Sequence, residues 1–339
     1  MLSQEFVDDP VLLSNWLPWG GLVREDVLLN KDDSMLGFIE YTPSLIQDKF
    51  IRMRNFKDGW SIWSEVQHHE DGSMHYFFVL CWNPFFRKLT NTVENAISNV
   101  IKKKGEEIDY FRQELHFLAQ DMAKVFPCRV MKYQEIIDFL SFSISLGKHH
   151  LVMPETPLYL DSWLTYELKT EFLENGLKID GENLCVVSLP SCPDEKILQM
   201  IFPRFNNLPF RYVKRLICTG REAADKNWTV YSKKWCGSRN YIKEAIHDDV
   251  LSRMNGYFDE GLFFLVSDEV LPRVQSFCNQ IMTVLEIPYI LEAFNLKDVW
   301  WGSLPGLFRA NINPPDIGFK HIDDLMFHVI PELEAEEEA

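Results

Sequence analysis

The stretch "KDVWWGSLPGLFRANINPP", residues 297–315, is the most distinctive part of this chain. Two tryptophans precede two glycines that bracket Ser-Leu-Pro, and Arg309 and Asn311 follow. Glycine-rich loops beside basic residues often bind phosphate groups through their backbone N–H groups. The first question is whether this loop is of that kind.

The loop does not fit the known phosphate-binding patterns. A P-loop requires G-x-x-x-x-G-K-[ST], whereas Gly306 is followed by Leu307 and Phe308. Pro305 also removes a backbone donor where the loop would need one. No segment matches the G-x-G-x-x-G pattern of dinucleotide-binding folds. We therefore interpret Gly302 and Gly306 as turn glycines, and we expect no cofactor in this chain.

The composition is that of an ordinary folded protein with an acidic balance. The chain has 339 residues, of which 46% are hydrophobic and 14% aromatic, and this length suits about two domains. Its net charge of −16 argues against nucleic acid as the main partner, because phosphate neutralisation needs clustered Lys and Arg. The short basic runs at 102–104, 211–215 and 233–234 are interpreted as solvated faces or helix ends.

Cysteine use and hydropathy indicate a reducing compartment. The seven cysteines are scattered and odd in number, which favours buried free thiols over a disulfide framework. The N-terminal residues carry acids where a secretory signal would carry Lys or Arg. The longest uncharged apolar stretch, 74–86, is interrupted by Asn83 and Pro84 and is shorter than the ~20 residues of a spanning helix. We expect a cytoplasmic protein that reaches a membrane only through a partner.

Alternating hydrophobic periods predict a mixed α/β or α+β fold with two successive sheet-plus-helix domains, at 1–150 and 151–313. Residues 314–339 are expected to be a linker stub with an acidic, disordered tail. Proline-containing residues 148–161 are interpreted as the connector between the domains. The expected strands lie near 20–41, 61–69, 73–82, 127–132, 183–190, 210–220, 261–267 and 289–294, and the helices near 43–56, 91–123 (with a possible break at Gly105), 133–146, 194–205, 221–255 and 271–286.

Two sets of residues are candidates for function. His321, Asp324 and His328 have helical spacing and could ligate Zn²⁺ or Mn²⁺, although helix capping and surface exposure explain them more simply. Partner contacts are the second possibility, since aromatic residues are enriched in interface cores and core packing is the alternative for each. These candidate contacts are Trp16, Trp19, Trp300, Trp301 and Arg309.

The distinctive stretch also resembles a family. "WWGSLPGLFRANINPP" is similar to the end of the non-motor N-terminal region in the CagE/TrbE/VirB family of conjugal-transfer and type IV secretion ATPases. Four further blocks resemble the family in the same order. They are "LSNWLPWGGLVREDVLLNKDDSML" (13–36), "PETPLYLDSWL" (154–164), "FRYVKRLICTG" (210–220) and "KKWCGSRNYIKEAI" (233–246).

The resemblance implies a docking and assembly role. It implies that this region anchors the motor to inner-membrane channel components of a type IV secretion system and supports homo-oligomerisation. The P-loop motor, with its ATP, is expected beyond these residues as a separate or fused part. By this interpretation the chain is not itself an enzyme. A truncated remnant without function is the first alternative, and a metal-dependent enzyme using residues 321–328 is the second.

Overall fold

A computed structural model of the chain describes residues 13–15, 17–42, 59–84, 96–147, 149, 151–153, 159–166, 168–173, 176–180, 182–189, 209–218, 258–267, 290–292 and 296–306, with residues 272, 275, 276 and 279. In the first half the elements are η1 (Leu13–Asn15), β1 (Trp19–Leu22), β2 (Leu28–Asn30), β3 (Met35–Tyr41), β4 (Trp60–His68), β5 (Met74–Trp82), α1 (Ala96–Met122), β6 (Cys128–Val130) and α2 (Gln134–Ser145). In the second half they are α3 (Leu160–Leu164), β7 (Thr170–Leu173), β8 (Gly176–Ile179), β9 (Glu182–Leu189), β10 (Phe210–Cys218), β11 (Phe258–Ser267), β12 (Ile290–Leu291) and α8 (Leu296–Ser303).

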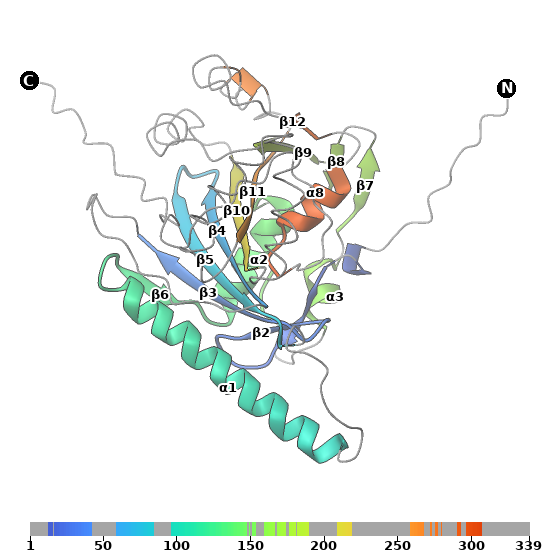
Figure 1. The fold of residues 1–339 in the computed structure, drawn as a ribbon. Coiled ribbons are helices and arrows are strands. Elements are labelled where there is room, and N and C mark those ends of the chain that lie inside the picture. The colour runs from blue at the N-terminus through green and yellow to red at the C-terminus, as the bar shows by residue number, and fades with distance from the viewer. Residues whose placement is uncertain are drawn as a thin grey trace, which may run out of the picture.

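The described strands form one twelve-stranded sheet whose main path is β1-β2-β3-β5-β4-β10-β11-β9-β8-β7 (Figure 1). Every described pairing is antiparallel, which places the fold in the α+β class rather than the α/β class. Local hairpins build each half, such as β4 with β5 and β7 with β8. The mixed sheet-and-helix class that the sequence predicts is confirmed.

The two halves of the chain are joined in the middle of the sheet. Strand β10 pairs with β4 along almost its whole length, from Phe210 opposite His68 to Ile217 opposite Ser61. Strands from both predicted domains therefore share one hydrogen-bonded sheet. The division into domains at residue 150 stays a prediction about independent folding, and its expected boundary lies between elements that this sheet connects.

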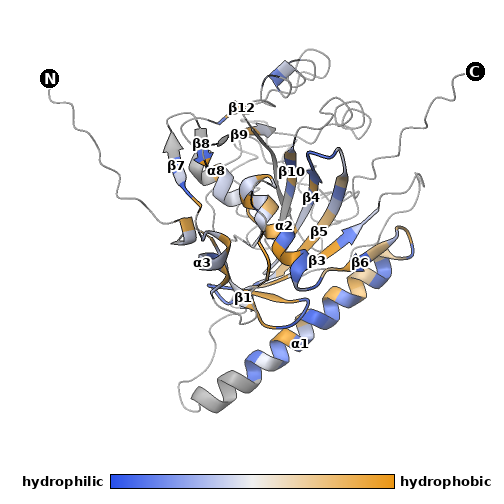
Figure 2. Ribbon diagram, turned by 180° about the vertical axis from the view of Figure 1, so that it is seen from behind, coloured by the Kyte–Doolittle hydropathy of each residue, from blue (hydrophilic) through white to orange (hydrophobic). Residues whose placement is uncertain are grey.

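Helices cover both faces of the first half of the sheet. Successive residues of a strand point to opposite faces, and Gly37 and Phe38 of β3 show which helix lies on which side. A Cβ on Gly37 would overlap Leu115 of α1, whereas the ring of Phe38 lies 5.1 Å from that of Phe139 in α2. Figure 2 shows the amphipathic character of α1, which is mostly hydrophilic with hydrophobic positions recurring along it. Helices α1 and α2 therefore enclose the sheet between them.

Most of the local predictions that fall on described residues are confirmed. The two hairpins turn at Lys31–Asp33 and around Gly72, and α2 ends where Leu146 and Gly147 adopt positive φ. Cys81 and Cys185 are buried free thiols, and burial raises the pKa of the Cys81 thiol well above its usual range. The helices expected at 43–56, 194–205 and 221–255 lie outside the described residues. Among the described helices, none combines the length and the apolarity that crossing a bilayer demands.

The expected break at Gly105 is wrong. Helix α1 runs without interruption through Gly105 over its 27 residues. Glycine weakens a helix through its backbone entropy but does not by itself end one. The apolar residues Ile108, Phe111 and Leu115, which are buried against the sheet, continue the helical period beyond Gly105.

Replacing Gly105 by Ala is therefore expected to stabilise the protein by roughly 0.5–1 kcal/mol, because the helix gains propensity. No atom lies within 4 Å of the new methyl group, apart from the helix's own backbone and chain neighbours. The matched variant Gly37→Ala is expected to cost about 1–3 kcal/mol, because its Cβ would lie 2.7 Å from Cδ1 of the buried Leu115. Urea unfolding of both variants measures this. A loss of stability in Gly105→Ala would mean that the helix is interrupted there.

Candidate functional site

The GSLPG loop is attached to the sheet through its carbonyl groups. Trp19 of β1 donates its indole N–H to the carbonyl oxygen of Pro305 at 3.0 Å. Asn30 of β2 donates from Nδ2 to the carbonyl oxygen of Gly306 at 3.2 Å. Residues 302–306 are all buried. A phosphate cradle presents backbone N–H groups to its ligand, whereas this loop uses carbonyl groups to hold itself against β1 and β2.

Gly306 is required by the geometry of this attachment. Its φ is +95°, a conformation that L side chains rarely adopt. A Cβ on Gly306 would lie 2.9 Å from Cδ1 of Leu36 and would overlap the side-chain amide of Asn30. The prediction of a turn glycine thus holds for Gly306. It is wrong for Gly302, which lies inside the last turn of α8.

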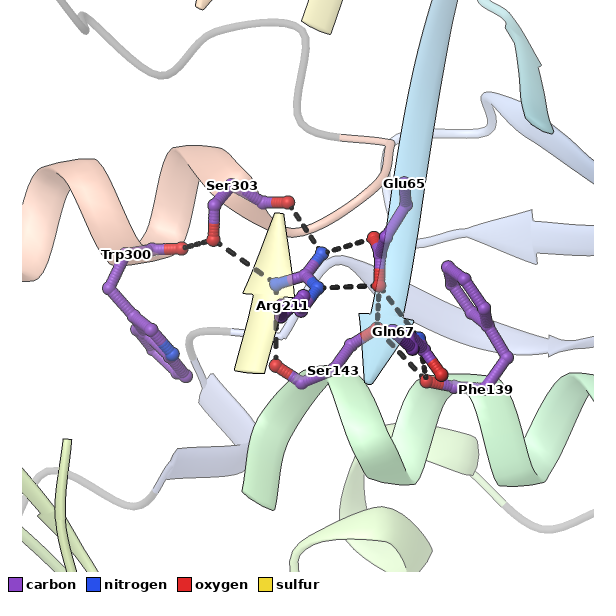
Figure 3. A network of polar contacts seen from close by, with 7 residues as sticks. All are labelled: Glu65, Gln67, Phe139, Ser143, Arg211, Trp300 and Ser303. Carbon is purple, nitrogen blue, oxygen red and sulfur yellow. Dashed lines mark hydrogen bonds and ion pairs between the residues drawn. The ribbon is translucent and has the colours of Figure 1, made fainter. Parts of the chain in front are cut away.

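A buried ion pair lies on the other side of the same segment (Figure 3). Arg211 of β10 and Glu65 of β4 have no exposed side-chain surface. Arg211 donates from Nε to Oε1 of Glu65 at 2.6 Å and from Nη2 to Oε2 at 2.7 Å. Val213 is the residue directly opposite Glu65, so Arg211 reaches its partner diagonally across the two strands. The result is a bidentate, charge-assisted contact.

The remaining N–H groups of Arg211 hold two helices. Nη2 donates to the carbonyl oxygen of Ser303 at 2.8 Å, and Nη1 donates to the hydroxyl of Ser303 at 3.2 Å and to the carbonyl oxygen of Ser143 at 3.4 Å. With the two bonds to Glu65, all five N–H donors of the guanidinium have acceptors within the protein. Arg211 therefore has no donor left for a phosphate or carboxylate ligand.

The acceptor side of the pair is equally occupied. Gln67 donates from Nε2 to Oε1 of Glu65 at 2.7 Å, and the hydroxyl of Ser143 lies 3.4 Å from the same oxygen. Ser143 also donates to the carbonyl oxygen of Phe139, and Ser303 to that of Trp300 (Figure 3). We call this set the Arg211 network: Glu65, Gln67, Phe139, Ser143, Arg211, Trp300 and Ser303.

The structure places the predicted partner contacts in different environments. Trp19 and Trp300 are completely buried, in agreement with the alternative of core packing. Trp301 is half-buried and packs on the edge of the core. Trp16 and Arg309 lie outside the described residues, as do His321, Asp324 and His328. The part of the chain that the structure describes contains no group of three His, Cys, Asp or Glu side chains able to hold a metal ion.

Sequence reasoning missed the Arg211 network. The basic run 211–215 was expected to lie on a solvated face, but Arg211 is completely buried and Lys214 almost so. The correction has a physical cause, since Glu65 lies on the neighbouring strand and neutralises Arg211. A signal was present in the sequence. Glu65 and Arg211 each stand within a strand of hydrophobic residues, at positions of the same alternation as buried neighbours.

Replacing Glu65 by Gln is expected to destabilise the protein by about 3–5 kcal/mol, because it leaves the buried charge of Arg211 without its counter-ion. The matched control is Lys124→Gln, which removes one partner of the Lys124–Asp121 pair, where the lysine side chain is 73% exposed. That change is expected to cost less than about 1 kcal/mol. Urea unfolding monitored by tryptophan fluorescence compares the two. Equal, small effects would mean that Arg211 does not depend on Glu65.

Comparison with known proteins identifies relatives of the chain. It is 26% identical over 233 residues to the conjugal transfer protein TrbE of Rhizobium radiobacter. It is also 26% identical over 266 residues to a protein of Sinorhizobium fredii described as a probable conjugal transfer protein of the TrbE type. No family model matches the chain.

The two matches cover 58% and 69% of this chain, but only 27% and 38% of the relatives' own lengths. The chain thus corresponds to about a quarter to two fifths of each relative. The order of blocks noted in the sequence and both matches point to the same proteins. This chain is related to the TrbE conjugal transfer proteins, as its sequence predicts.

Proposed function

We propose that this chain is the docking and assembly region of a TrbE-like component of a conjugal transfer system. The observation that carries the proposal is the pair of matches to TrbE proteins, which extend over more than half of the chain. In this role the chain anchors a P-loop motor to inner-membrane components of a type IV secretion system. The motor is a separate or fused part of the same machine.

The way the chain is held together suits such a role. Side chains from β1, β2 and β10 all bind the segment 303–306, which follows directly on α8. A rigid body whose late segment is fixed to its early strands transmits a displacement between the components that it connects. The saturated hydrogen bonds of Arg211 favour this mechanical role over ligand binding.

Catalysis is proposed to belong to the motor. The sequence contains no G-x-x-x-x-G-K-[ST] motif, so the proposal assigns no ATP and no other cofactor to these residues. It also places the chain on the cytoplasmic face of the inner membrane, where it is held by protein partners. Homo-oligomers are compatible with this arrangement.

The test is deletion of the gene in its native host, combined with purification of a tagged full-length chain. Conjugal transfer is expected to fall by orders of magnitude and to return with the complementing gene. Membrane-associated transfer components are expected to purify with the tagged protein. Unchanged transfer after deletion would favour a remnant without function, and a stoichiometric metal ion in the purified chain would favour a metal-dependent enzyme.

Trp301 is the candidate contact through which docking can be tested residue by residue. Replacing Trp301 by Ala is expected to weaken partner binding by about 2 kcal/mol, or roughly thirtyfold, if this ring lies in the interface core. Tyr133, which is 50% exposed and precedes α2, provides the matched control in Tyr133→Ala. Pull-down yields of the two variants are compared at equal thermal stability. Equal yields would remove Trp301 from the interface.

A further inference from the structure

The most exposed large hydrophobic side chains of the described structure come from one short region. Tyr159 is 79% exposed, Val152 78% and Tyr166 60%. The other exposed large hydrophobic side chains among the described residues are between 37% and 50% exposed. Exposed apolar residues are ordinary when scattered, but a local group of this kind marks an interaction surface.

Helix α3 and the turn after it arrange three aromatic residues on one side. Tyr159, Trp163 and Tyr166 are spaced by four and three residues, which is the helical spacing of one face. Trp163 donates its backbone N–H to Tyr159 at 3.1 Å, and its ring lies 6.4 Å from that of Tyr166 with the planes at 10°. Leu160 and Leu164 instead turn into the core. We call Tyr159, Trp163 and Tyr166 the aromatic face.

The aromatic face also contains a hydrogen-bond donor without an acceptor. The indole Nε1 of Trp163 is buried and has no hydrogen-bond partner among the described residues. Buried N–H groups of tryptophan usually find an acceptor. The face thus presents apolar rings around one polar group that a binding segment can satisfy.

The last described residues of the chain end close to this face. The carbonyl oxygen of Gly306 is bonded to Asn30, and the next residue, Lys31, forms an ion pair of 2.6 Å with Asp161 of α3. Lys31 also donates to the carbonyl oxygen of Ser14 at 2.7 Å, so it connects η1 and α3. Residues 307–339 therefore begin beside α3.

That following sequence contains a segment of complementary chemistry. In "HIDDLMFHVI", residues 321–330, the apolar residues Ile322, Leu325, Met326 and Val329 recur at helical spacing. The fourteen residues 307–320 can span up to ~45 Å when extended at ~3.3 Å each, which is far enough to reach α3. Methionine sulfur packs well against aromatic rings, and Asp323 and Asp324 offer acceptors for an N–H donor.

We propose that the aromatic face binds the segment 321–330 of the same chain, with the apolar stripe of that segment against Tyr159, Trp163 and Tyr166. This intramolecular contact folds the end of the chain back onto α3. It is independent of the proposed role in conjugal transfer, because it concerns only residues of this chain.

The experiment measures hydrogen–deuterium exchange in the full-length protein. Leu325→Asp with Met326→Asp places two charges in the apolar stripe, and exchange in residues 159–166 is expected to become several-fold faster. The matched control, Asn311→Asp with Asn313→Asp, adds the same charge outside the stripe and is expected to leave this exchange unchanged. The reciprocal variant Tyr159→Ser with Tyr166→Ser is expected to accelerate exchange in residues 321–330.

Two results would overturn the proposal. The first is equal exchange of residues 159–166 in the original chain, the stripe variant and the control. The second is protection of residues 159–166 that rises with protein concentration and does not respond to the stripe variant, which would assign the aromatic face to a second copy of the chain. Thermal unfolding of each variant confirms that a change in exchange is local.

Discussion

Arg211 and Glu65 form an ion pair with no exposed surface, and the relative positions of two helices and two central strands depend on it. Two charges in a protein interior are costly unless all of their hydrogen-bonding groups are satisfied. Here the guanidinium uses every donor, and its acceptors come from β4, α2 and the end of α8. Moving any one of these elements leaves a buried polar group without a partner. The arrangement is therefore close to all-or-none.

The same logic explains the chemistry of the GSLPG loop. Its composition of glycine, serine and proline beside basic residues suits either an anion site or a tight structural turn. The direction of the peptide groups decides between them, because Trp19, Asn30 and Arg211 all act as donors to the loop's carbonyl groups. Two of these contacts join residues that are 286 and 276 positions apart in the chain. The loop closes the fold by holding its latest described segment to its earliest strands.

Local periodicity was enough to predict most of the described elements, because hairpins and amphipathic helices depend on neighbouring residues. The hairpin from β4 to β5 and the helix α2 are examples. The pairing of β4 with β10 could not be predicted, since no local pattern specifies which strand of a distant segment completes an edge. The buried position of Arg211 was missed for the same reason, as its charge is tolerable only beside Glu65. Trp19 and Trp300 were correctly given core packing as an alternative, but their residue type alone could not decide between core and interface.

The pairing of β4 with β10 also has a consequence for how the protein forms. Strand β4 pairs with β5 on one side, and its other side is completed only by residues 210–218. During synthesis the first half of the sheet therefore waits, with an open hydrogen-bonding edge, until well over a hundred further residues have been made. Contacts of such long sequence separation slow folding, and unpaired strand edges invite association with other chains. Production of this protein is thus sensitive to chaperones and to the rate of translation between β5 and β10.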